Sequence, residues 1–104
     1  MRIEVLYFDG CPNHEPLLDR LRDTLAALGV SAAIDLCRIA GDAEAQRERF
    51  IGSPTIRING HDIEPGADER TDFGMKCRLY RTTSGLAGQP QDELLQAAIR
   101  SSAR

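Results

Sequence analysis

The order of the first three predicted elements is the feature that most constrains how this chain can fold. Residues 2–8 (RIEVLYF) are a compact apolar run of β-forming residues, typical of a strand largely covered on both faces. Residues 12–29 carry leucines at spacings of three and four, which predicts an amphipathic helix that begins at Pro12 and ends at Gly29. Residues 32–39 (AAIDLCRI) read as a second strand. A strand, a helix and a strand in this order imply two parallel strands joined by a right-handed crossover.

The rest of the chain completes a predicted β-α-β-α-β-β-α order. Asn59-Gly60 is a preferred two-residue type I′ turn and therefore predicts a hairpin over residues 54–63. The other expected segments are a short helix at 42–50, a polar loop at 64–74, a short strand or extended stretch at 76–82, a break at 85–90 and a closing helix at 91–103. We therefore expect one α/β domain over residues 1–104, with helices on both faces of a mixed four-stranded sheet.

Composition argues against several classes of partner. The net charge is −3, and acids and bases are scattered without the basic stripe that would bind nucleic acid or an anionic membrane. No apolar run approaches the ~20 residues needed to span a bilayer. The N-terminal residues read as a strand and not as a signal peptide. We therefore expect a cytoplasmic protein with neither a nucleic-acid nor a membrane partner.

The chain has three cysteines, an odd number that argues against a framework of structural disulfides in a reducing compartment. Cys11 comes directly before Pro12, at the predicted N-terminus of a helix, where the dipole and the unpaired N–H groups favour a thiolate. An unreactive cysteine at a helix start is the alternative. His14 lies three residues later on the same side, and it would stabilise the thiolate, donate a proton, bind a metal or have no task.

The other two cysteines receive different predictions. Cys77 stands between Lys76 and Arg78, whose positive charges would favour its thiolate, and it would resolve a disulfide begun at Cys11. It would equally complete a metal site with Cys11 and His14, because thiolate and imidazole ligands suit zinc, copper(I) or mercury(II). Cys37 alternates within its strand and is expected to be a small buried hydrophobic residue without chemistry.

Two short motifs give the chain a resemblance to the thioredoxin-like superfamily. Residues 8–14 (FDGCPNH) stand where that family has its Cys-x-x-Cys motif, and residues 52–60 (GSPTIRING) are similar to its segment of small residue, cis-proline and strand. The resemblance covers the whole chain in topology, except for an apparent insertion at about 64–89. It implies a cis Ser53–Pro54 bond beside Cys11, and it implies substrate binding by residues Pro12, Asn13, Ser53, Pro54 and Thr55.

This chain departs from the family pattern at one position. His14 replaces the second cysteine of the motif, so a disulfide within the motif cannot form. The chain is therefore similar to single-cysteine, glutaredoxin-like arrangements, in which glutathione or a distant cysteine resolves the mixed disulfide.

Three functions follow as hypotheses. In the first, the protein is a monothiol thiol–disulfide oxidoreductase without a resident cofactor, although glutathione would serve as co-substrate. Its Cys11 thiolate would attack a glutathione-mixed or protein disulfide held at the Ser53–Pro54–Thr55 turn. In the second, Cys11 and Cys77, with or without His14, form a soft-metal binding module. In the third, a non-catalytic thioredoxin-fold scaffold binds a partner through the same cleft.

Overall fold

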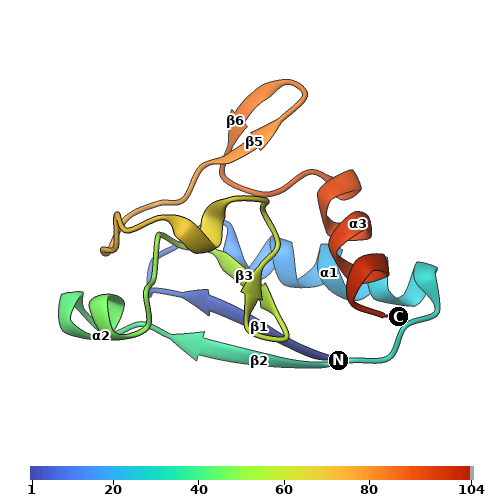
Figure 1. The fold of residues 1–104 in the computed structure, drawn as a ribbon, viewed down its shortest axis with the longest axis horizontal. Coiled ribbons are helices and arrows are strands. Elements are labelled where there is room, and N and C mark those ends of the chain that lie inside the picture. Colours follow the sequence, from blue (N-terminus) through green and yellow to red (C-terminus); the bar gives the residue numbers. More distant parts are fainter. Residues whose placement is uncertain (104) are drawn as a thin grey trace.

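The structure is a computed structural model that describes residues 1–103 (Figure 1). Its elements, in chain order, are β1 (Arg2–Tyr7), α1 (His14–Leu28), β2 (Ala33–Arg38), α2 (Asp42–Arg47), β3 (Thr55–Ile58), β4 (His61–Asp62), the 3₁₀-helix η1 (Ala67–Glu69), β5 (Tyr80–Thr82), β6 (Gly85–Ala87) and α3 (Asp92–Ser102). The predicted order is present, with η1 and the β5–β6 hairpin added before α3. Within residues 1–103, every helix is too short or too polar to cross a membrane.

Four of the strands form one mixed sheet in the order β2-β1-β3-β4. Strand β1 runs parallel to β2, as the helical crossover predicts, and antiparallel to β3. Strands β3 and β4 form the predicted hairpin, in which Asn59 and Gly60 have φ angles of 53° and 87°. Both angles are positive, as a type I′ turn requires. The mixed four-stranded sheet predicted from the sequence is therefore confirmed.

Helix α1 begins later than the sequence predicted. Its first residue is His14, and Pro12 lies outside the helix. The N-cap residue is Asn13, whose carbonyl accepts a hydrogen bond from the N–H of Leu17 at 3.1 Å. The prediction of Pro12 as the first helical residue is therefore wrong, because a tight turn occupies the residues before Pro12. The predicted end is correct: Gly29 caps the helix in the left-handed conformation at φ 67°.

The main hydrophobic core lies between the sheet and two helices. Ile3 and Val5 of β1 point to the same face because side chains alternate along a strand. Helices α1 and α3 pack on that face, on the same side of the sheet (Figure 1). The buried members of this cluster are Ile3, Val5, Leu17, Leu18, Leu21, Leu25, Ile56, Ile58, Ile63, Tyr80, Leu95 and Ile99.

A smaller cluster covers one end of the opposite face. Leu6 of β1 packs there with Ala45 of α2 and with Phe50 and Ile39, so helices do lie on both faces. Helix α2 ends at Arg47, earlier than predicted, and Arg49 soon afterwards has a φ of 55° that no α-helix contains. The short helix leaves much of this face uncovered. The expectation that residues 2–8 are covered on both faces is therefore only partly correct.

The segment between β4 and α3 differs most from the prediction. Residues 80–87, interpreted as a strand end followed by a break, form a two-stranded hairpin of β5 and β6. The hairpin projects from the body of the molecule (Figure 1). Gly85 is the first residue of β6 and has a φ of 112°, which glycine adopts without steric cost. A glycine at this position therefore permits the tight turn into β6.

Candidate functional site

A tight turn between β1 and α1 carries Cys11. Gly10 has a φ of 88°, which glycine adopts without steric cost, and the N–H of Cys11 donates to the carbonyl of Phe8 at 3.3 Å. Cys11 is buried, with 6% of its surface exposed. Helix α1 begins three residues later, so this thiol lies just ahead of a helix N-terminus. The dipole and the unpaired N–H groups of such an end favour an anion.

His14 is held against the backbone of this turn. Its Nδ1 donates to the carbonyl oxygen of Cys11 at 3.0 Å, and its ring stacks on Tyr7 with 4.3 Å between ring centroids. Its Nε2 lies 4.0 Å from a carboxylate oxygen of Glu15. These contacts hold the Cys11 carbonyl and leave the imidazole stacked face to face on the Tyr7 ring. The structure therefore gives His14 a positioning contact with Cys11 through the carbonyl group, and no hydrogen bond is present to the sulfur within residues 1–103.

The Ser53–Pro54 bond is cis, as the resemblance implied. Ser53 lies beside the Cys11 turn, because its Oγ accepts a hydrogen bond from the N–H of Phe8 at 3.4 Å. Thr55 is buried in β3 and donates from its hydroxyl to the carbonyl of Gly52 at 2.6 Å. The Ser53–Pro54 turn therefore lies at the end of β1 from which the chain enters the Cys11 turn.

The hydrogen-bonding groups of this turn are already used within the chain. The N–H of Ser53 donates to the carbonyl of Lys76 at 2.9 Å, and the carbonyl of Ser53 accepts from the N–H of Arg78 at 3.0 Å. The carbonyl of Pro54 accepts from the hydroxyl of Tyr80 at 2.5 Å. Residues 76–80 thus bond to the backbone of Ser53 and Pro54, two of the residues that were predicted to bind substrate.

The backbone hydrogen bonds from Ser53 to Lys76 and Arg78 bring Cys77 to the Ser53–Pro54 turn. It pairs with Ser53 in a single parallel β-bridge, and it is exposed, whereas Cys11 is buried. Ser53 also contacts Phe8, which begins the turn that ends at Cys11. Cys11 and Cys77, 66 residues apart in the sequence, therefore lie at the same end of the sheet.

The charged neighbours of Cys77 do not have the role that the sequence suggested. Lys76 forms an ion pair with Asp72 at 2.8 Å. Arg78 is fully buried and forms two hydrogen bonds with the carboxylate of Asp62, at 2.6 and 2.8 Å. The hypothesis that both cations serve the Cys77 thiolate is therefore replaced: each has a carboxylate partner of its own.

The buried Arg78–Asp62 pair is the principal feature that sequence reasoning missed. The Arg78 guanidinium also lies 3.5 Å from Glu64, 3.3 Å from the hydroxyl of Thr55 and 4.1 Å from the centre of the Tyr80 ring. Burial alone would lower the pKa of Arg78, but its carboxylate partners raise it above the ordinary value. Nothing in the local pattern around residue 78 distinguishes a buried arginine from a surface one.

The second predicted half of the substrate site, Pro12 and Asn13, lies at the mouth of α1. The side chain of Asn13 packs against Gly88, so closely that a Cβ at position 88 would overlap the amide nitrogen of Asn13. Two turns further along the helix, Arg20 donates to the side-chain oxygen of Gln89 at 2.9 Å. The segment after β6 therefore contacts the helix beside Cys11, just as residues 76–78 contact Ser53.

Cys37 lies apart from these groups. It stands opposite Leu6 on β2, on the sheet face away from α1, and its sulfur is 3.9 Å from a carboxylate oxygen of Glu4. Burial raises the pKa of the Cys37 thiol, and the negative charge of Glu4 raises it further. The side chain is half-buried, which corrects the expectation of a fully buried residue.

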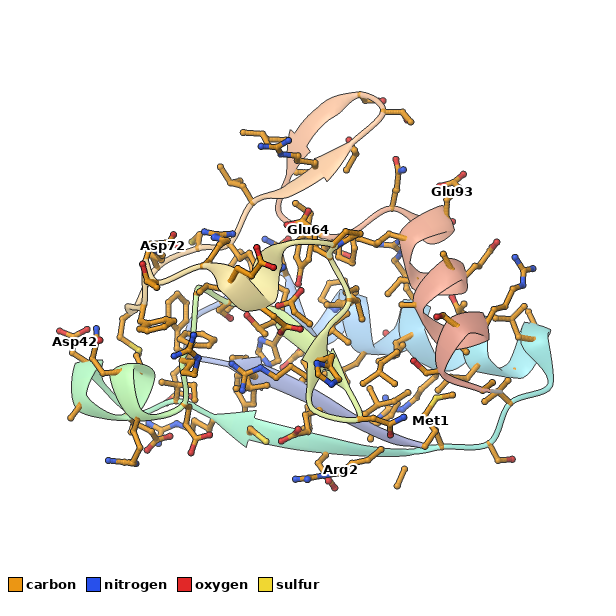
Figure 2. The ribbon with its side chains drawn as sticks, viewed as in Figure 1. Met1, Arg2, Asp42, Glu64, Asp72 and Glu93 are labelled. Carbon is orange, nitrogen blue, oxygen red and sulfur yellow. The ribbon has the colours of Figure 1, made fainter. Side chains whose placement is uncertain are left out.

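A cavity of about 810 Å³ lies between the β5–β6 hairpin, η1 and the start of α3. Glu64 and Glu93, on its rim, lie at the foot of the hairpin and at the first turn of α3 (Figure 2). Its lining includes none of the predicted site residues. Elsewhere too, among residues 1–103, no three histidine, cysteine, aspartate or glutamate side chains are arranged to hold a metal ion.

Comparisons of the chain with family models, curated proteins and solved structures gave no match. The functional argument therefore rests on the geometry of the Cys11 turn, the Ser53–Pro54 turn and residues 76–80.

Proposed function

We propose that this protein is a cytoplasmic thiol–disulfide oxidoreductase with a thioredoxin-like fold, in which the Cys11 thiolate is the nucleophile. The observation that carries the proposal is the β-bridge between Ser53 and Cys77, which brings a second, exposed thiol to the turn beside Cys11. The strand order β2-β1-β3-β4, with a helix between the parallel strands, supports the choice of fold.

The chemistry is exchange between thiolates and a disulfide. The Cys11 thiolate attacks one sulfur of a glutathione-mixed or protein disulfide, a new sulfur–sulfur bond forms, and the other sulfur leaves as a thiolate. A second thiolate, from glutathione or from Cys77, then attacks the mixed disulfide and displaces one of its sulfurs as a thiolate. Cys11 lies just ahead of the N-terminus of α1, and the His14 hydrogen bond holds its peptide in place.

The test is turnover of a glutathione-mixed disulfide by the reduced protein, with glutathione as electron donor. We expect Cys11→Ser to abolish turnover and Cys37→Ser to leave it unchanged, because Cys37 lies on the other face of the sheet. Wild-type turnover by Cys11→Ser would overturn the proposal.

Two other outcomes would assign a different function. Stoichiometric binding of zinc, copper(I) or mercury(II), lost in Cys11→Ser and Cys77→Ser, would favour a soft-metal module if turnover is absent. Absence of both turnover and metal binding would leave a non-catalytic scaffold.

A further inference from the structure

We infer that Cys77 is the built-in resolving thiol for Cys11, and that the buried Arg78–Asp62 pair is the element that positions it. The oxidised product would then be an internal Cys11–Cys77 disulfide, formed from a small disulfide such as oxidised glutathione. This inference rests on the proposed function and deepens it, because it selects between glutathione and Cys77 as the second thiol.

The first step of the argument is the place that residues 76–78 occupy. Ser53 bonds to Lys76 on one side of Cys77 and to Arg78 on the other, so Cys77 stands directly opposite Ser53. Paired strands lie about 4.8 Å apart. An incoming peptide or glutathione therefore finds the backbone of Ser53 already paired, and the thiol that stands there belongs to the chain itself.

The second step is the direction of the side chains. Along an extended segment, the side chains of successive residues point to opposite sides. Arg78 points into the protein, where its side chain is 0% exposed, and Cys77 next to it is exposed. The arginine thus holds the backbone of residue 77 from the inside and leaves the thiol on the outer side.

The third step is the strength of this attachment. Both guanidinium NH₂ groups of Arg78 bond to the carboxylate of Asp62, which is itself only 4% exposed. Gly52 allows the close approach: a Cβ there would stand 2.9 Å from the Cβ of Arg78. Residues 71–76, by contrast, belong to no helix or strand. The position of Cys77 therefore depends on the buried contacts of Arg78, which follows it, and less on residues 71–76, which precede it.

The reaction balances with one small disulfide as oxidant. The Cys11 thiolate attacks oxidised glutathione and releases one glutathione thiolate. The Cys77 thiolate then attacks Cys11 sulfur in the mixed disulfide, which forms the internal disulfide and releases the second glutathione thiolate. Two protein thiols are oxidised and one glutathione disulfide is reduced to two thiols.

The experiment treats reduced protein with oxidised glutathione, stops the exchange with acid and measures intact and peptide masses over time. Wild type should accumulate the internal disulfide, whereas Cys77→Ser should stop with glutathione on Cys11. Asp62→Asn should form the Cys11 adduct at the wild-type rate but convert it to the internal disulfide at least about tenfold more slowly. Lys76→Met, the matched control next to Cys77, should convert it normally.

The outcomes separate this inference from the proposed function. Glutathione that stays on Cys11 in the wild type, or wild-type conversion by folded Asp62→Asn, would overturn the inference and leave the proposed function standing. A protein in which Cys11 takes up no glutathione would overturn both. If circular dichroism shows that Asp62→Asn is unfolded, Glu64→Gln takes its place, because it removes a further carboxylate charge 3.5 Å from the same guanidinium. It should slow the conversion by a smaller factor of at least about twofold, and wild-type conversion would overturn the inference.

Discussion

Residues 2–28 and residues 76–80 both send buried side chains into the protein, but with different chemistry. The first region buries Ile3 and Val5 of β1 and four leucines of α1 in a continuous apolar core. The second is held by a buried ion pair, a buried tyrosine hydroxyl and two backbone hydrogen bonds. Apolar packing spreads its stabilisation over many side chains, whereas the second region depends on a few polar contacts whose loss leaves a buried group unpaired.

The variant with the largest expected effect is Asp62→Ala. It removes the partner of the buried Arg78 guanidinium and leaves that charge uncompensated, which costs about 3–5 kcal/mol when a buried pair is broken. Urea unfolding followed by circular dichroism measures the loss. Asp72→Ala is the control, since it breaks exposed pairs with Arg70 and Lys76 that are worth about 0–1 kcal/mol. Equal losses in the two variants would refute the contrast between the regions.

In the apolar region the matching variant is Leu21→Ala. This side chain is fully buried between α1 and the sheet, so its truncation should destabilise the protein by about 2–5 kcal/mol in the same assay. The control is Leu86→Ala in the hairpin, where the leucine is 66% exposed and the change should stay within about 0.5 kcal/mol. A large loss at Leu86 would mean that the hairpin packs against something in solution.

A smaller effect is expected for Tyr80→Phe, which leaves the Pro54 carbonyl without its donor at a cost of about 1–3 kcal/mol. Tyr80 also leads us to expect that the protein loses stability at alkaline pH. Burial raises the pKa of Tyr80 above its ordinary value near 10, more than the Arg78 charge lowers it. Above pH about 10 the unfolded chain therefore releases a proton that the folded chain keeps, and stability falls as the pH rises. Tyr80→Phe should lose this part of the pH dependence of urea unfolding between pH 9 and 11.

The smallest expected effect concerns the thiols, and it is measured as a rate of alkylation and not as a free energy of unfolding. The raised pKa of Cys37 gives this thiol a smaller thiolate fraction than an ordinary cysteine has at the same pH, and its side chain is less exposed than that of Cys77. Cys37 should therefore alkylate more slowly than Cys77 at neutral pH. Peptide mass spectrometry after a short pulse of iodoacetamide measures both rates. Glu4→Gln should speed Cys37 alone, because it removes the nearby negative charge. Faster labelling of Cys37 than Cys77 in the wild type would show that the two exposures are reversed in solution.

The same contrast explains how much the sequence could predict. Periodic leucines and the Asn59-Gly60 pair are local signals, and they correctly predicted α1, the hairpin and the mixed sheet. The start of α1 was wrong because the turn at Gly10 precedes it, and no leucine spacing reports such a turn. The resemblance correctly predicted the cis Ser53–Pro54 bond, but the partner of Arg78 depends on a contact across 16 residues. A charged residue that is buried looks the same in the sequence as one in water.

The packing of Gly88 against Asn13 has an evolutionary consequence. Gly88 does not adopt the left-handed conformation that favours glycine, so the backbone by itself would accept alanine. A side chain at position 88 would instead require the amide of Asn13 to move, because that amide lies where a Cβ would stand. Selection therefore acts on the two positions together: in a descendant of this chain, a side chain gained at position 88 should accompany a smaller or redirected one at position 13.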